Sequence, residues 1–189
     1  MIAQSLFVGE YTRLAPIDPD RDAAAESTWT HNPDYARRIS RQNYRPLAVF
    51  EIKKIYGDML KRLDEYAACY PFAIRRRADD VLLGSCRIEN IQWSHGNALL
   101  SHYLGHPGAK VEEWLESLQL ITAYAFGELG LNRLTFLICE NEKELAGYLG
   151  KVGFIPEVRQ REMHYRDGQY FDGIRYGILY QDWIAARRD

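Results

Sequence analysis

Residues 99–110 read LLSHYLGHPGAK and join a strand pattern to the start of a long helix. After the glycine- and proline-containing turn, apolar residues recur every three or four positions and predict one apolar helix face: Leu115, Leu118, Ile121, Ala125 and Leu129. The start of this helix is a candidate anion site, because its first N–H groups have no partner within the helix. Glu112 and Glu113 oppose that use, since carboxylates there satisfy the helix dipole and repel a phosphate.

A second strand follows this helix at residues 133–139, and it is apolar nearly throughout. That pattern is typical of a strand buried on both faces. A strand, a crossover helix and a second strand predict a parallel pair, because an antiparallel return needs only a short turn. The turn after residue 104 therefore lies at the carboxyl end of a parallel strand, where open α/β sheets bind ligands.

The remaining sequence supplies more strands and helices around this pair. We predict a mixed α/β (α+β) fold with one central sheet, formed by a single domain over residues 1–189. The expected strands are 7–15, 71–76, 81–88, 161–165 and 170–180. The expected helices are 21–30, capped by Asp20, then a short arginine-rich piece after Asp34, and 48–66 and 142–150.

Composition excludes several classes of protein. The formal net charge of −2 and the pI near 6.2 provide no field that attracts nucleic acid or an anionic membrane surface. No stretch approaches the ~18 apolar residues of a membrane span. The three cysteines are far apart and form no C-x-x-C pair, so we expect no disulfide framework and no zinc site. We expect a soluble protein of the reducing cytoplasm.

Some local patterns allow two interpretations. The run Arg75-Arg76-Arg77 is interpreted as the charged tip of a hairpin rather than a nucleic-acid patch, because no aromatic residues alternate with it. Trp29, Cys86 and Cys139 are expected in the core. The aromatic residues of the last hairpin are core or a dimer surface, and core is the preferred interpretation: Tyr165, Tyr170, Phe171, Tyr176 and Tyr180. The protein is therefore a monomer or a homodimer.

Several short motifs occur together in a definite order, and they carry a family resemblance. They are YAFGELGLNRL at 124–134, ENE at 140–142, KVGF at 151–154 and RDGQYFD at 166–172. This chain resembles the GNAT N-acetyltransferases, in particular their ribosomal-protein alanine acetyltransferase-like branch. The resemblance implies the GNAT fold: a single mixed, mostly antiparallel sheet with a splayed parallel central strand pair, flanked by helices. It also implies acetyl-CoA between the fourth and fifth strands, and acetyl transfer to a primary amine of a small molecule or a protein N-terminus, without a metal.

The resemblance also implies roles for individual residues. Tyr148 would protonate the leaving thiolate, and the base that deprotonates the amine would be Glu89 or His102. The residues implied to contact the cofactor are Tyr103, Leu104, Gly108, Ala109, Lys110 and Asn141. The acceptor pocket would be built by residues 32–46 and the hairpin near Gly168.

The pyrophosphate loop departs from the family pattern. The positions of its spaced glycines fall at Lys110, Glu112 and Trp114, where side chains hinder close approach of the backbone to phosphate. Gly108 and Lys110 offer a shifted alternative. Two hypotheses follow: an acetyl-CoA-dependent N-acetyltransferase, or a GNAT-like domain that has lost CoA binding and acts as a non-catalytic interaction module.

Overall fold

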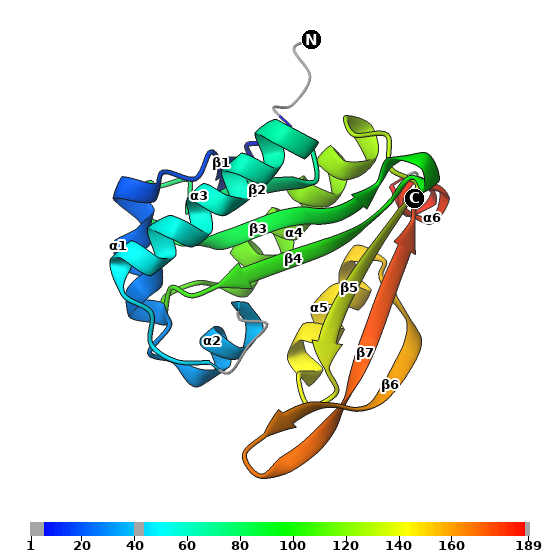
Figure 1. Cartoon of the computed structure of the whole chain (residues 1–189). Coiled ribbons are helices and arrows are strands. Elements are labelled where there is room, and N and C mark those ends of the chain that lie inside the picture. Colours follow the sequence, from blue (N-terminus) through cyan, green and yellow to red (C-terminus); the bar gives the residue numbers. More distant parts are fainter. Residues whose placement is uncertain (1–5, 40–43, 188–189) are drawn as a thin grey trace.

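The computed structural model describes residues 6–39 and 44–187, which form a seven-stranded sheet in the order β1-β2-β3-β4-β5-β7-β6 (Figure 1). The strands are β1 (Thr12–Ala15), β2 (Cys69–Arg76), β3 (Leu82–Gln92), β4 (Asn97–Leu104), β5 (Arg133–Cys139), β6 (Ile155–Arg166) and β7 (Gln169–Leu179). Strands β4 and β5 are parallel and the other neighbours are antiparallel. The predicted mixed sheet with a parallel central pair is confirmed.

Helices cover both faces of the sheet. They are α1 (Pro19–Trp29), α2 (Pro33–Ile39), α3 (Val49–Tyr66), α4 (Val111–Gly127), α5 (Lys143–Val152) and α6 (Tyr180–Ala185), with a 3-10 turn, η1 (Trp93–His95). Figure 1 shows α1 and α3 on one face and α4 and α5 on the other. Among the described residues, no helix combines the length and the apolar character that crossing a membrane requires.

Two hydrophobic clusters follow from this layering. The larger lies between the sheet and α4 and α5, and includes Leu118, Ile121 and Phe136. The smaller lies under α1 and α3, and includes Trp29, Ile52 and Tyr56. Neighbouring residues of a strand point to opposite faces, so β2 supplies Ala73 to the smaller cluster and Ile74 to the larger. Trp29, Cys86 and Cys139 are buried, as predicted.

Strands β4 and β5 separate soon after they pair. Their register joins Asn97 to Arg133, Ala98 to Leu134 and Leu99 to Thr135. Beyond these pairs, β4 continues against β3 and β5 continues against β7. The facing edges of β4 and β5 therefore lose their strand partners over residues 100–104 and 136–139, and backbone donors and acceptors are left along the gap.

The boundaries of several elements differ from those predicted. Asp18, not Asp20, caps α1, because its Oδ1 accepts the N–H groups of Asp20 at 3.0 Å and Arg21 at 3.2 Å. Strand β1 begins only at Thr12, since a turn with the Gly9 N–H bonded to the Thr12 carbonyl at 2.9 Å precedes it. Periodicity also did not predict two elements, the exposed first half of β6 and the short helix α6.

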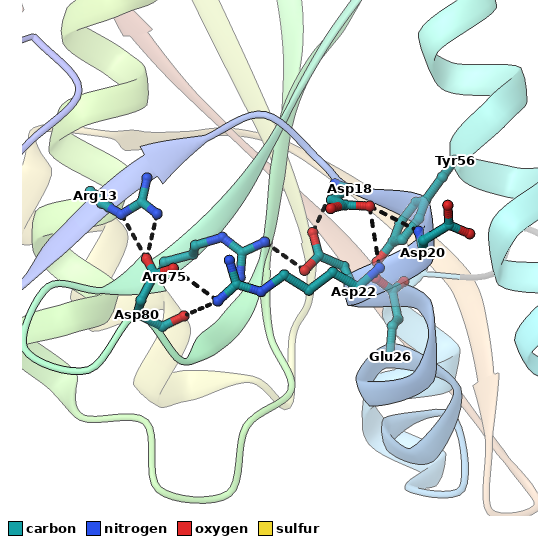
Figure 2. Close-up of polar contacts among 9 residues, drawn as sticks. Arg13, Asp18, Asp20, Asp22, Glu26, Tyr56, Arg75 and Asp80 are labelled. Carbon is teal, nitrogen blue, oxygen red and sulfur yellow. Dashed lines mark hydrogen bonds and ion pairs between the residues drawn. The ribbon is translucent and has the colours of Figure 1, made fainter.

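The interpretation of Arg75-Arg76-Arg77 as a charged tip is wrong for Arg75. Its side chain is 3 % exposed and its Nη2 donates to Asp22 Oδ1 at 2.6 Å (Figure 2). The other carboxylate oxygen of Asp22 accepts the Asp18 N–H at 2.9 Å. This buried pair attaches α1 to the sheet, and the hydrogen bonds to both oxygens offset the loss of solvation.

The expectation that the aromatic C-terminal hairpin is core is wrong at its tip. Tyr165 and Tyr170 are 65 % and 63 % exposed, and their rings contact each other at a tilt of 54° with centroids 5.0 Å apart. They lie next to the turn at Asp167 and Gly168, beyond the edge of the helical layers (Figure 1). Alternation alone could not separate an extended hairpin tip from a strand that a helix covers.

We predict that Asp22→Asn strongly destabilises the fold, because it leaves the buried Arg75 guanidinium without its counter-charge. The expected loss of unfolding free energy is about 3–5 kcal/mol, measured by urea denaturation. Asp20→Asn is the matched control on the same helix, since Asp20 is exposed and its carboxylate pairs with Lys53 at 2.6 Å on the surface. A loss no larger for Asp22→Asn than for this control would contradict a structural role of the pair.

Candidate active site

A cavity of about 500 Å³ lies where β4 and β5 separate. Its walls are residues 99–103 of β4, residues 136–139 of β5 and the end of β3 at Glu89. Helix α2 and strand β6, which are more than 100 residues apart in the sequence, close its mouth with residues 37–39 and with Met163, His164 and Arg166. The cavity is therefore assembled by the splayed pair and by two segments that only the fold brings together.

His102 is a buried side chain on the β4 wall. Its Nε2 lies 2.8 Å from Ser117 Oγ of α4, and that hydroxyl donates to the Glu113 carbonyl at 2.6 Å. Because the Ser117 proton is already used, the network assigns the imidazole proton to Nε2, and Ser117 Oγ accepts it. Nδ1 is then a lone-pair acceptor, and it has no partner among the described residues. Burial lowers the pKa of His102 to about 3, so the ring is neutral at pH 7.

Glu89 of β3 contributes a carboxylate to the cavity lining, from the face of the sheet opposite to that of His102. It is 3 % exposed, accepts a hydrogen bond from Ser101 Oγ at 2.8 Å and lies 3.2 Å from Arg87 Nε. The Arg87 guanidinium also lies over the Tyr103 ring, 5.6 Å from its centroid. Glu89 is therefore held in one orientation at the end of β3, beside the gap between the strands.

Gly105 sets the path of the chain as it leaves β4. A Cβ built on Gly105 would lie 2.3 Å from a ring carbon of Trp29, so a larger residue would displace that buried indole. The N–H groups of Gly105 and His106 both donate to the Leu83 carbonyl, at 2.9 and 3.0 Å. The turn is thus anchored to β3 and to the cluster beneath α1.

The N–H groups of the following loop are bonded within the loop itself. Gly108 donates to His106 Nδ1 at 3.0 Å, and Ala109 donates to the His106 carbonyl at 3.0 Å. Lys110 donates to Glu113 Oε2 at 2.8 Å. These three donors are occupied, so any anion at this loop relies on the donors that follow them.

The first turn of α4 still has free donors. The N–H groups of Val111, Glu112 and Glu113 have no acceptor within the described part of the chain. The Glu113 carboxylate folds back over the start of the helix, where its Oε2 accepts the Lys110 N–H and its Oε1 accepts from Arg76 Nε at 2.6 Å. Burial by itself would raise the pKa of Glu113, but the hydrogen bonds from Arg76 and the Lys110 N–H outweigh burial and lower it. Arg76 thus neutralises one of the two carboxylates that sequence analysis set against an anion.

Trp114 and Tyr148 lie on the inner side of this helix start. The Trp114 ring is 8 % exposed, packs edge-on to His102 at 4.8 Å and contacts the Tyr148 ring at 5.3 Å, measured between centroids. Lys151 Nζ lies 5.8 Å from the centroid of the Tyr148 ring. Trp114 therefore joins β4 to α5 within the core, and its bulk does not lie on the exposed side of the helix start.

A group of charged side chains lies at the cavity mouth around Glu142, the residue before α5. Glu142 Oε1 accepts from Arg38 Nε at 2.7 Å and lies 3.7 Å from Arg166 Nη1, and its Oε2 accepts the Cys139 N–H at 2.7 Å. Arg166 Nη1 also donates to Asn141 Oδ1 at 3.3 Å. Two arginines from distant segments thus share one carboxylate.

The structure brings some of the sequence-predicted residues together and separates others. Glu89, His102 and Tyr103 line the cavity. Leu104, Gly108, Ala109 and Lys110 follow along the end of β4 and its loop, and Asn141 and Tyr148 lie on the α5 side, outside the lining. The sequence analysis gave no role to the charged residues of the mouth, although their segments were indicated: residues 32–46 hold Arg37 and Arg38, the ENE motif holds Glu142, and the last hairpin holds Arg166. Part of the first segment, residues 40–43, lies outside the described residues.

Solved structures share this fold. A protein described as a probable acetyltransferase superposes with a TM-score of 0.78 at 18% identity, covering 93% of this chain and 96% of its own. Spermidine N-acetyltransferase from Vibrio cholerae in complex with CoA and spermine gives a TM-score of 0.78 at 17% identity, covering 93% of this chain and 99% of its own. At these identities the likeness shows the fold alone. No curated protein sequence matches the chain.

The family follows from the sequence match. Residues 19–174 match the family described as "Acetyltransferase (GNAT) domain". The match spans most of the chain, including the splayed strands, the loop and α4, and the chain therefore belongs to the GNAT acetyltransferase family.

We predict that His102 makes stability fall as the solution becomes acidic. Its pKa of about 3 in the folded protein lies below the ordinary value of about 6.5, so below pH ~6.5 the unfolded chain binds a proton that the folded protein does not. Between pH ~6.5 and pH ~5 the wild type should lose about 2 kcal/mol more than His102→Gln. Urea denaturation at the two pH values measures this, and equal losses in both proteins would contradict a neutral buried imidazole.

Proposed function

We propose that this protein is an acetyl-CoA-dependent N-acetyltransferase that acetylates a primary amine. The observation that carries the proposal is the cavity in the splay of β4 and β5, which places a buried carboxylate and a neutral imidazole beside unpaired strand edges. Membership of the GNAT family supports the same reaction class. The amine nitrogen forms a bond to the acetyl carbon as the C–S bond breaks, and it loses one proton while the CoA thiolate gains one.

Acetyl-CoA, when bound, supplies the acetyl group as a thioester. The residues at the start of α4 fit its pyrophosphate in chemistry: three free N–H groups at 111–113, the positive end of the helix dipole and the Lys110 side chain. Glu113 is paired with Arg76, which removes most of its opposition to an anion. The unpaired edges of β4 and β5 offer backbone groups to the amide-containing arm of CoA.

Glu89 is the better candidate for the group that receives the proton of the amine. A histidine with a pKa of about 3 cannot hold a proton at pH 7, so His102 is a poor base. Its Nδ1 is buried, and its ring is held against α4 by Ser117 and Trp114. We therefore assign proton acceptance to Glu89 and a supporting role in the β4 wall to His102.

The non-catalytic alternative is not favoured. It rested on side chains in place of the loop glycines, at Lys110, Glu112 and Trp114. Trp114 is buried in the core, whereas Lys110 and Glu112 are exposed. The free N–H groups of the first turn are the remaining support for phosphate binding at this position.

We predict saturable binding of acetyl-CoA in isothermal titration calorimetry, within the ~1 µM–1 mM range usual for enzyme substrates. Lys110→Glu should weaken this binding about tenfold, because it places a third carboxylate at the start of α4. Lys54→Glu, an exposed change on α3, is the control and should leave the affinity unchanged. Absence of any heat at ~1 mM acetyl-CoA would contradict the proposed function.

We predict that Glu89→Gln lowers kcat about 100-fold while acetyl-CoA affinity is retained, because the amide cannot accept the proton. Tyr148 remains the candidate for protonating the thiolate, and Tyr148→Phe should lower kcat about tenfold with the same affinity. Release of the CoA thiol in the presence of an amine measures both rates.

Glu144→Gln and Tyr170→Phe are the matched controls, since Glu144 and Tyr170 are exposed and do not line the cavity. Thermal unfolding of each variant shows whether the fold is intact. An intact Glu89→Gln protein with wild-type kcat would remove Glu89 as the proton acceptor, and the same result for Tyr148→Phe would remove Tyr148 as the acid.

A further inference from the structure

The charges on the cavity wall are unequal. Among the described residues that line the cavity, four are arginines and two are glutamates: Arg37, Arg38, Arg87, Arg166, Glu89 and Glu142. The two lining histidines add no positive charge at pH 7. The pKa of His102 is about 3, and that of His164 is lowered mainly by burial and further by Arg166.

Both carboxylates of the wall are already occupied by cations. Glu89 lies against Arg87 and accepts from Ser101. One carboxylate oxygen of Glu142 pairs with Arg38 and Arg166, and the other accepts the Cys139 N–H. A polyamine would have to displace an arginine from one of these carboxylates, and neither glutamate is more than 10 % exposed.

The excess positive charge lies at the mouth, on Arg38 and Arg166. They share the single charge of Glu142, and the Arg166 side chain is 10 % exposed. Arg37 also lines the cavity, but it pairs with Asp167 at 2.9 Å and with Asp34 at 3.6 Å, and both of these carboxylates are largely exposed. An incompletely balanced guanidinium in a site of low dielectric is stabilised by an added anion, and its planar donors suit a carboxylate or a phosphate.

We propose that the acceptor is a primary amine that also carries an anionic group, a carboxylate or a phosphate, which Arg38 and Arg166 bind at the cavity mouth. This assignment rests on the proposed N-acetyltransferase function and names the substrate class of the same site. The anionic end lies against α2 and β6, and the amino group extends toward Glu89 in the splay. The spermine in the Vibrio cholerae structure is a polycation, whereas the arginines at this mouth favour an anion.

The test compares acceptors that differ in charge, with acetyl-CoA as donor and release of the CoA thiol as readout. L-glutamate is the carboxylate-containing amine and phosphoethanolamine is the phosphate-containing one. L-glutaminamide, called the amide below, and spermidine have no anionic group. We expect kcat/KM for at least one anionic amine to exceed that of both others about tenfold or more. Arg166→Gln and Arg38→Gln should each raise KM for the anionic amine about tenfold and leave the KM of the amide unchanged.

Control variants separate charge from structure. Arg166→Lys keeps the charge, so its KM for the anionic amine should rise less than that of Arg166→Gln. Arg161→Gln should have no effect, because Arg161 is exposed on the same strand and lies outside the cavity lining.

A preference for spermidine or the amide would overturn the assignment. An equal rise in KM for all acceptors in Arg166→Gln and Arg38→Gln would also overturn it. If acetyl-CoA binds and no anionic amine is acetylated, the acceptor assignment is wrong and the proposed function stands. If acetyl-CoA does not bind, the proposed function itself fails.

Discussion

Three residue pairs join β4 to β5, and the cavity exists because their pairing stops at Leu99 and Thr135. Parallel strands that stayed together would satisfy each other's backbone groups and close the gap. Here each strand stays paired on its other side, β4 with β3 and β5 with β7. The gap therefore opens inside the sheet while both strands remain part of it. The proposed reaction depends on this opening, because the buried Glu89 carboxylate and the unpaired backbone groups of β4 and β5 line it.

Buried ion pairs hold the β4 side of the opening in place. Arg75 and Asp22 attach α1 to the sheet, and Arg87 and Glu89 stand on the cavity wall itself. Between them, Glu26 is buried and accepts a hydrogen bond from the Tyr56 hydroxyl, and burial raises the pKa of Glu26. Such a network is costly if one member is lost, and when complete it holds the wall in one arrangement. The position of Glu89, the proposed proton acceptor, therefore rests on Arg87 and on buried residues behind it that do not line the cavity.

The start of α4 illustrates how side-chain direction changes the meaning of a motif. A glycine-poor loop implied a damaged phosphate site, since three large residues stand where small ones are expected. In the fold, Trp114 packs between His102 and Tyr148, and Glu113 pairs with Arg76 from β2. The neutralising arginine lies 37 residues earlier in the chain, so no local pattern could have included it.

The sequence by itself determined most of the order of helices and strands, the parallel pair and the buried strand at 133–139, because periodicity and turn residues are local properties of the chain. The resemblance to the GNAT family indicated Glu89 and His102. The tertiary structure decided the rest: where the pairing of the parallel strands stops, that Arg75 is buried, and that Arg38, Glu142 and Arg166 meet at one mouth. Charge pairing between segments more than 100 residues apart depends on how the sheet and its hairpin are placed in space, and no local pattern encodes that placement.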